Sequence, residues 1–257
     1  GGLGHCSTCR MCGFRIFILR RIITLTSSTT WTSTNIGCGT ISTPTLRESV
    51  VLFDLDGVLI AARPWHREAL RQALREQGLD ITPAQEAEWE GLPTRVKLAN
   101  LGLGADISKA VADEKQRLTL RLLHANARPL PNVLETLKRL RLEGKRIGIC
   151  SNAMRATVYA AMWRTGIAKY IDLVLSNEEA RVPKPDPCIY LMALSCIKER
   201  AENVVAVEDN EKGVRAARGA GIRVVQVSDP SEVAYWRLLE EEVAQRLDPR
   251  GGSRETV

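Results

Sequence analysis

The sequence predicts an α/β fold: a Rossmann-like parallel sheet core with helices on both faces and an inserted, all-helical cap. Short apolar runs rich in Val and Ile alternate with amphipathic stretches of helical period along residues 50–228. Strands that helices cover on both faces require such continuous apolar runs. Roughly ninety residues separate the first run from the second, far more than an ordinary crossover needs. A separate unit is therefore inserted there.

The strands and helices follow in order along the chain. We expect strands at VVLFD (50–54), RIGICS (146–151), LVLS (173–176), VVAVED (204–209) and RVVQVS (223–228). Helices between them cover the sheet. In the helix expected at 132–144, apolar residues recur at helical spacing, and Gly144 ends it.

The inserted segment, 64–128, contains helical patterns only. They are WHREALRQALREQG, PAQEAEWEG, PTRVKLANLG and ISKAVADEKQRLTLRLLHA. We expect a helical cap over 64–128, inserted into a catalytic core formed by 48–63 and 129–247, with a flexible C-terminal tail over 248–257.

The first 47 residues differ in composition from the rest. The net charge is +6, and residues 1–47 hold five Arg, no Lys and no acidic residue, so residues 48–257 carry only 6 − 5 = +1. A nearly neutral folded part argues against nucleic-acid binding. Organellar transit segments and translated non-coding sequence share this composition. We expect a disordered or targeting-like tail and a cytoplasmic protein, or an organellar one if the tail is a transit peptide.

Two other features of the tail indicate neither a metal site nor a membrane span. Cys6, Cys9 and Cys12 are closely spaced, but no second Cys/His pair follows at zinc-finger spacing. The apolar stretch 14–25 is interrupted by three arginines and is too short to cross a bilayer.

Two carboxylates stand at the end of the first expected strand. Asp54 and Asp56 are two residues apart, so both side chains can point to one face of an extended chain. Open α/β sheets place their sites at the carboxyl ends of strands. Gly57 then permits a turn where a bulkier residue would block close approach of a ligand. In isolation, such a pair would be better explained as a simple turn with a capping Asp.

Four stretches, in order, resemble the motifs of the haloacid dehalogenase-like superfamily. They are FDLDGV (53–58), ICSN (149–152), VPKPDPCIYLMA (182–193) and VAVEDNEKGVRAARGAG (205–221). The resemblance spans about residues 50–230, and the helical insert resembles the subgroup that contains β-phosphoglucomutase and phosphoglycolate phosphatase. One departure is Ala61, where related sequences commonly have Asp.

The resemblance implies a phosphatase, and the residue types fit that chemistry. Asp54 is suited to attack phosphorus and form an aspartyl phosphate. Asp56 can protonate the leaving oxygen and later activate water, which contributes on the order of 10²–10⁴-fold. Mg²⁺ prefers carboxylate and phosphate oxygens, so we expect it to be held by Asp54, Asp56, Glu208 and Asp209. Helix capping is the alternative explanation for Asp209.

The remaining site residues depend mainly on the resemblance. Ser151 can donate its hydroxyl to a phosphate oxygen, and Lys184 can offset the charge that builds up in transfer. Asn152, in the same motif as Ser151, is expected to bind substrate.

The cap supplies three further candidates for substrate binding: His66, Arg95 and Lys115. WHREAL and GLPTRVKL resemble cap segments that contact substrate in this subgroup. The alternatives are that Arg95 lies on a solvated helix face and that His66 packs near the hinge.

We therefore expect a Mg²⁺-dependent phosphatase that acts on a small phosphorylated metabolite, without nucleic-acid or membrane partners, as a monomer or weak dimer. A sugar-phosphate mutase with the same aspartyl phosphate is the alternative enzyme. A non-catalytic binding module on the same fold is the alternative outside enzymes.

Overall fold

The central feature is one parallel sheet of five strands in the order β3-β2-β1-β4-β5. The computed structural model describes residues 45–239. The strands are β1 Val50–Phe53, β2 Arg146–Cys150, β3 Leu173–Leu175, β4 Val204–Glu208 and β5 Arg223–Gln226. Each forms within one of the predicted apolar runs, and β1 lies at the centre between β2 and β4.

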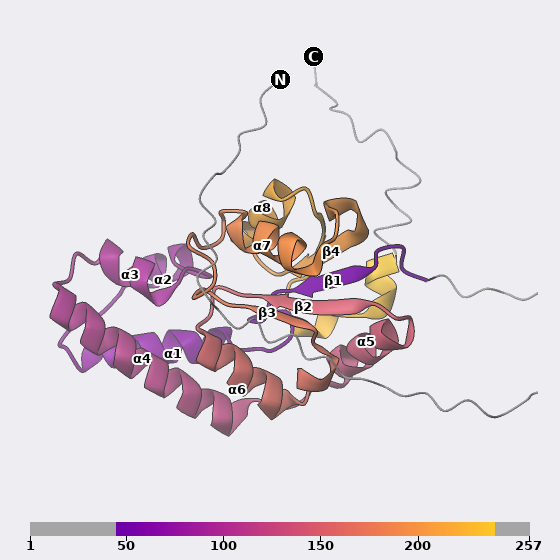
Figure 1. The fold of residues 1–257 in the computed structure, drawn as a ribbon. Helices are drawn as coiled ribbons and strands as arrows, with labels where there is room; N and C mark the ends of the chain where they lie inside the picture. The colour runs from indigo at the N-terminus through magenta and orange to yellow at the C-terminus, as the bar shows by residue number, and fades with distance from the viewer. Residues whose placement is uncertain (1–44, 240–257) are drawn as a thin grey trace, which may run out of the picture.

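Helices cover both faces of the sheet (Figure 1). They are α5 Pro131–Leu142, α6 Arg155–Thr165, α7 Cys188–Ile197 and α8 Glu211–Gly219. Val51 and Phe53 of β1 pack with α5 and α6 in one apolar cluster. Val50 and Leu52 belong to a second cluster with α7 and α8. Because successive strand residues point to opposite faces, the apolar run buries both of its sides, and the predicted α/β fold class is confirmed.

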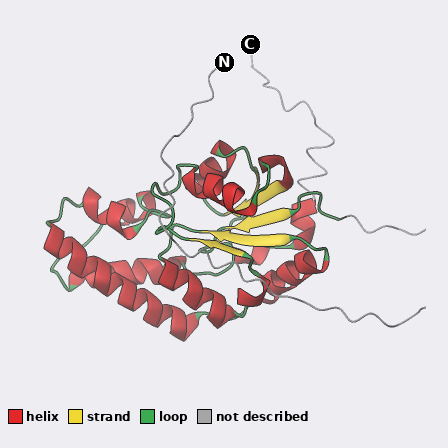
Figure 2. Ribbon diagram, viewed as in Figure 1, coloured by secondary structure: helices red, strands yellow, loops and turns green. Residues whose placement is uncertain are grey.

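The insert between β1 and α5 consists of helices and loops, with no strand among its described residues (Figure 2). Its helices are α1 Arg63–Arg75, α2 Pro83–Glu88, α3 Thr94–Asn100 and α4 Ala105–Asn126. They form an apolar cluster of their own, which includes Leu74, Trp89 and Leu118. Helix α4 packs along α1 and also contacts α6 of the core.

The loop between α2 and α3 is hydrogen-bonded to the core. Lys212 Nζ donates to the carbonyl oxygens of Glu88 at 3.1 Å and Glu90 at 2.9 Å. Asn152 Nδ2 donates to the Gly91 carbonyl at 2.9 Å. Gly91 has φ of +74°, a left-handed conformation that glycine adopts without strain. These bonds hold the insert over the edge of the sheet.

Core packing begins before the expected tail boundary at residue 47. Leu46 is 2% exposed, its N–H donates to Tyr235 Oη at 3.1 Å, and Glu48 pairs with Arg223 at 2.7 Å. Leu46 therefore belongs to the core, because its apolar side chain packs in the cluster of α5 and α6.

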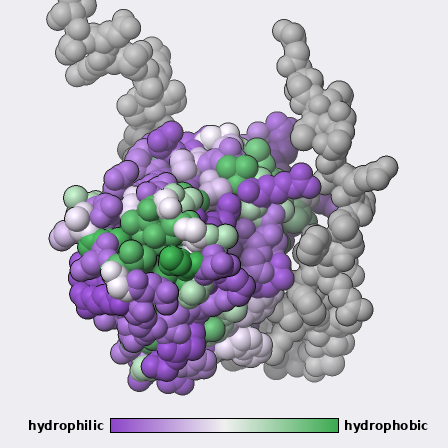
Figure 3. Space-filling model, turned by 90° about the vertical axis from the view of Figure 1, so that its left-hand side faces the viewer, coloured by the Kyte–Doolittle hydropathy of each residue, from purple (hydrophilic) through white to green (hydrophobic). Residues whose placement is uncertain are grey.

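Several of the sequence predictions concern residues outside the described range, 45–239. The Cys6–Cys12 cluster, the apolar stretch 14–25, the end of the expected core and the tail 248–257 all lie outside it. Within the described residues, no helix is both long and apolar enough to cross a membrane. Figure 3 views the end of the molecule formed by the insert, where an apolar patch is surrounded by hydrophilic side chains.

Candidate active site

Polar side chains from three strands gather at one edge of the sheet. Asp54 follows β1, Ser151 follows β2, and Glu208 and Asp209 lie at the end of β4. The chain leaves β1 toward β2 and later returns to its other side as β4. Such a switch in strand order leaves a crevice at the carboxyl ends of the strands. The sequence therefore brings these four residues together through the sheet alone.

Lys184, from the loop before α7, joins the strand ends. Its ammonium donates to Asp54 Oδ1 at 2.8 Å, Glu208 Oε1 at 2.6 Å and the Cys150 carbonyl at 2.7 Å. The Lys184 side chain is 3% exposed, so these bonds form away from water. The hydroxyl of Tyr190 also donates to Glu208 Oε1. A buried charge of this kind is stable only when paired.

The surroundings of Asp54 act on its pKa in opposite directions. Burial raises the pKa of Asp54 well above its usual range, and the neighbouring carboxylates add to that effect, while the charge of Lys184 opposes it. Within residues 45–239, Lys184 is the one hydrogen-bond donor to the Asp54 carboxylate, and it binds Oδ1. The other oxygen, Oδ2, is available to a ligand.

The carboxylates fit a divalent cation. Asp54, Glu208 and Asp209 can each offer one oxygen, all within 4.8 Å of one another. Glu208 Oε2 is fully buried with no hydrogen-bond partner, a costly arrangement for an isolated acceptor. Hard oxygen donors are the ligands that Mg²⁺ prefers. Asp56, which the sequence also predicted as a ligand, is not in this group of three; its Oδ2 lies 3.0 Å from His66 Nε2, and its Oδ1 is buried without a hydrogen-bond partner among the described residues.

Arg63, at the start of α1, forms an ion pair with the Asp209 carboxylate. Its Nε donates to Asp209 Oδ2 at 2.8 Å, and its Nη2 donates to the same oxygen and to the Asp209 carbonyl at 3.2 Å. The same Nε lies 3.3 Å from Glu90 of the insert. Gly57 makes room for this pair, since a Cβ there would lie 1.7 Å from Asp209 Oδ2. Arg63 thus links the insert to the carboxylate group.

The Asp56 carboxylate contacts His66, which in turn contacts Lys115; both of these residues belong to the insert. His66 Nε2 lies 3.0 Å from Asp56 Oδ2, and Lys115 Nζ lies 3.1 Å from His66 Nδ1. Because an ammonium can only donate, Nδ1 accepts and the neutral ring carries its proton on Nε2, facing Asp56. Burial lowers the pKa of His66, which favours this neutral form. Burial also lowers the pKa of Lys115, to about 8, assisted by the charge of Lys97.

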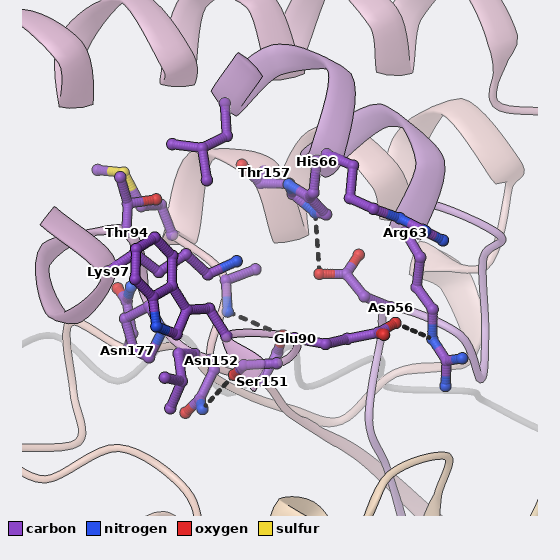
Figure 4. A pocket seen from close by; sticks show the side chains of 18 of the residues that line it. Asp56, Arg63, His66, Glu90, Thr94, Lys97, Ser151, Asn152, Thr157 and Asn177 are labelled. Atoms are coloured by element: carbon purple, nitrogen blue, oxygen red, sulfur yellow. Dashed lines mark hydrogen bonds and ion pairs between the residues drawn. The ribbon is translucent and has the colours of Figure 1, made fainter. Parts of the chain in front are cut away.

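The pocket lies between the core and the insert (Figure 4). Arg63 and His66 enter it from α1, and Thr94 and Lys97 from α3. Of the predicted substrate-binding residues, His66, Lys115 and Asn152 line it. Arg95 is exposed and is not among the residues that line the pocket.

Two predicted core residues have additional partners. Asn152 Oδ1 accepts from the Lys184 N–H at 3.1 Å and its Nδ2 binds Gly91, so Asn152 ties the Lys184 loop to the insert. Ser151 Oγ accepts from the Ala153 N–H at 3.1 Å. Its hydroxyl proton has no acceptor within the described residues and can be given to a ligand.

Arg63 and Lys97 are among the pocket residues that sequence reasoning missed. Arg63 lies two residues after Ala61, the departure noted after the first motif, and a charged residue so close to a lost charge was a usable signal. Lys97 lies two residues beyond Arg95. Nothing in the sequence fixes which side of so short a helix faces the pocket.

Comparisons with known proteins identify the family. The family model of the haloacid dehalogenase-like hydrolases matches residues 51–227. A phosphorylated carbohydrates phosphatase of Thermotoga maritima is 31% identical over 179 residues, which cover 67% of this chain and 81% of that protein. A phosphoglycolate phosphatase of Rhodospirillum rubrum is 32% identical over 192 residues, which cover 69% and 78%.

The fold has solved counterparts. A β-phosphoglucomutase of Clostridium difficile superposes with a TM-score of 0.69 at 18% identity, covering 78% of this chain and 99% of that one. At this identity the likeness concerns the fold. The sheet and its helical insert are therefore an arrangement that known structures share.

Proposed function

The chain belongs to the haloacid dehalogenase-like hydrolases, and on this basis we propose that it is a Mg²⁺-dependent phosphatase of a small phosphorylated metabolite. The observation that carries the proposal is the placement of Asp54. It lies at a strand end, with Lys184 on one carboxylate oxygen and the other oxygen available in the pocket. The relatives named above as phosphatases support the reaction class.

In the first half-reaction, an oxygen of Asp54 attacks phosphorus. The bond from phosphorus to the leaving oxygen breaks, and that oxygen takes a proton from Asp56. The products are an aspartyl phosphate and the free alcohol. Splitting one displacement into two easier ones is the advantage of a carboxylate nucleophile. Asp56 must be protonated for this step, and the negative charge of the bound phosphoryl group raises its proton affinity.

In the second half-reaction, water attacks the same phosphorus. Asp56 takes a proton from the water, the bond from phosphorus to Asp54 breaks, and inorganic phosphate leaves. His66, whose Nε2 lies 3.0 Å from Asp56 Oδ2, lowers the pKa of Asp56 against the effect of burial. Asp56 is thereby held as the carboxylate that this step needs.

Fixed groups of the site balance the negative charge of the buried carboxylates and of the phosphoryl group. Asp54, Glu208 and Asp209 would hold Mg²⁺, which when bound neutralises charge on the phosphoryl oxygens. Lys184 offsets the charge of two buried carboxylates, and the Ser151 hydroxyl is positioned to donate to a phosphoryl oxygen. The insert closes the pocket through its bonds to Asn152 and Lys212, which limits the access of bulk water. The cytoplasmic location and the monomeric or weakly dimeric state remain predictions.

The experiment uses p-nitrophenyl phosphate, whose leaving group needs little protonation. With Mg²⁺ present, Asp54→Asn should abolish phosphate release and covalent labelling, since an amide is a poor nucleophile. Asp56→Asn keeps the nucleophile and should still become phosphorylated, then hydrolyse slowly. Intact mass spectrometry after acid quench detects the added phosphoryl group.

Asp113→Asn is the matched control, because Asp113 lies on α4 with a side chain 67% exposed. It should turn over like the wild type. Phosphorylation of the Asp54→Asn protein, or wild-type turnover by both site variants, would contradict the proposal.

A further inference from the structure

The two carboxylate oxygens of Glu208 have different surroundings. The side chain is fully buried at the end of β4. Its Oε1 accepts hydrogen bonds from Lys184 Nζ at 2.6 Å and from the Tyr190 hydroxyl. Its Oε2 is buried and has no hydrogen-bond partner among residues 45–239. The two donors therefore engage one oxygen of the carboxylate and leave the other to a ligand.

Lys184 alone does not fix the orientation of this carboxylate. Its ammonium also donates to Asp54 Oδ1 at 2.8 Å and to the Cys150 carbonyl at 2.7 Å. An ammonium has three protons, so three acceptors set its position. Hydrogen-bond donors prefer to lie near the plane of the group that accepts them. A single donor still lets the Glu208 carboxylate turn, whereas a second donor from another element, the Tyr190 hydroxyl, defines its plane.

Tyr190 is itself held in place by its surroundings. It lies in the first turn of α7, and its side chain is fully buried in the apolar cluster shared by α7 and α8. These two helices lie side by side on one face of the sheet (Figure 1). Lys184 Nζ lies 5.3 Å from the centroid of the Tyr190 ring, within the range of a cation–π contact. Because a phenol keeps its proton at neutral pH, the hydroxyl is a fixed donor to Glu208.

Helix α8 leaves space on the side of Oε2. A Cβ at Gly213 would lie 1.9 Å from Glu208 Oε2 and 2.5 Å from Oε1, so a larger residue there would displace the carboxylate. The Gly213 N–H donates to Asn210 Oδ1 at 3.1 Å, which caps the helix beside Glu208. The Glu208 carboxylate is therefore oriented by two donors to Oε1, with open space kept next to Oε2.

A structural role alone explains only part of this arrangement. A buried tyrosine hydroxyl usually finds a hydrogen-bond partner, and Oε1 of Glu208 is that partner. The same explanation leaves Oε2 buried with no donor among the described residues, which is costly for a carboxylate oxygen. A cation held at the carboxylate group would compensate this cost.

We propose that Tyr190 is a positioning residue that fixes Glu208 Oε2 toward the proposed Mg²⁺ and gives the site its preference for Mg²⁺ over Ca²⁺. Mg²⁺ requires a near-ideal octahedron of oxygen ligands, whereas Ca²⁺ accepts a more variable arrangement. A carboxylate held in one orientation therefore favours Mg²⁺, and one that can turn suits Ca²⁺ better. This inference rests on the ion site of the proposed phosphatase.

The test replaces Tyr190 by phenylalanine, which removes the hydroxyl and keeps the buried ring. The Kd for Mg²⁺ should rise about ten- to a hundredfold, the usual effect of losing a hydrogen-bond partner of a metal ligand. The Kd for Ca²⁺ should rise much less, so the preference for Mg²⁺ should fall about tenfold. Isothermal calorimetry on the ion-free full chain measures both affinities without turnover.

Tyr235→Phe is the matched control, because it also removes a hydrogen bond between a tyrosine and a carboxylate. Tyr235 Oη donates to Glu143 Oε2 at 2.5 Å and accepts from the Leu46 N–H at 3.1 Å. None of these residues lines the pocket. Both variants should lower the melting temperature of the ion-free protein, but only Tyr190→Phe should change the ratio of the two ion affinities.

Three results would overturn the assignment of Tyr190. Unchanged Kd values for both ions in Tyr190→Phe would make Tyr190 a residue of the core only. An equal rise in both would indicate a change in charge and not in orientation. A wild type that binds neither ion, or a Tyr235→Phe protein with the same shift in preference, would also contradict it.

Phosphate release from p-nitrophenyl phosphate, measured on the same proteins, tests the phosphatase function separately. A wild type that binds Mg²⁺ but releases no phosphate contradicts that function. The ion affinities of Tyr190→Phe and Tyr235→Phe then still decide the role of Tyr190.

Discussion

Replacing Arg63 by alanine is expected to tighten Mg²⁺ binding, because Arg63 and the cation compete for the same carboxylate. The guanidinium makes its contacts to Asp209 Oδ2 and to the Asp209 carbonyl. The Asp209 side chain is 1% exposed and that of Arg63 30%, so solvent weakens the pair only in part. A hydrogen bond to a charged group contributes about 1.5–3 kcal/mol. Removing this competitor should lower the Kd for Mg²⁺ by about ten- to a hundredfold.

Isothermal calorimetry with Mg²⁺, and electron paramagnetic resonance with Mn²⁺, measure the affinity directly without turnover. Arg67→Ala is the control, because Arg67 lines the same pocket and has no bond to Asp209 among the described residues. It removes the same formal charge, so its smaller effect gives the long-range electrostatic contribution. The melting temperature offers a second readout: without Mg²⁺ the Arg63→Ala protein should melt lower than the wild type, and added Mg²⁺ should recover the difference.

An unchanged or weaker affinity in Arg63→Ala would refute this reasoning. It would mean that Asp209 does not contribute to the ion site, or that Arg63 itself helps to form it. An equal gain in Arg67→Ala would assign the effect to net charge in the pocket and not to the contacts of Arg63.

Three other perturbations have defined outcomes. Lys184→Met leaves two buried carboxylates without their cation and should reduce the free energy of unfolding by about 3–5 kcal/mol, measured by urea denaturation; a loss below 1 kcal/mol would contradict the buried bridge. Lys115 is charged below its pKa of about 8, so kcat/KM for an anionic substrate should fall as the pH rises through that value; a flat profile between pH 7 and 9 would exclude a role for its charge. Deleting residues 1–47 removes the buried Leu46 and should lower the free energy of unfolding by about 2–4 kcal/mol more than deleting residues 1–44. Equal melting temperatures for the two truncated proteins would show that Leu46 adds no stability.

The sheet and the residues at its edge could be predicted because each depends on a short local pattern. Apolar runs covered on both faces predict the strands, and the carboxyl ends of parallel strands meet at one edge. Asp54, Ser151 and Asp209 therefore come together wherever the runs are identified. Lys184 was assigned by resemblance, since its loop has no periodic pattern that would direct it to the edge.

The burial of Glu208 illustrates what such patterns leave out. The sequence suggested a metal ligand at the end of an apolar run, and the residue does lie beside the other two carboxylates. It is also completely buried and receives hydrogen bonds from Lys184 and Tyr190. Tyr190 reads as an ordinary core residue of α7, and its hydroxyl finds Glu208 only through helix packing against the sheet.

The wall formed by the insert could not be predicted, because it depends on how one unit docks on another. Helix α3 spans only seven residues, Thr94–Asn100, and offers Arg95 on one side and Lys97 on the other. Its orientation follows from the bonds between the preceding loop and Lys212 and Asn152 of the core. Those partners are more than sixty residues away in sequence, so no local pattern records them.

Arg63, at the start of α1, links the insert to the carboxylates of the core. Ala61 is exposed, and Arg63, two residues further on, connects Glu90 of the insert to Asp209 of the core. A cation bound at Asp209, as proposed above, would weaken one end of this connection and leave Arg63 to pair more fully with Glu90. Because linkage between two sites is reciprocal, a change at Glu90 that alters insert docking must also change the affinity of the carboxylates for the ion. With the proposed ion bound, its affinity and the docking of the insert would therefore be coupled through the Arg63 side chain.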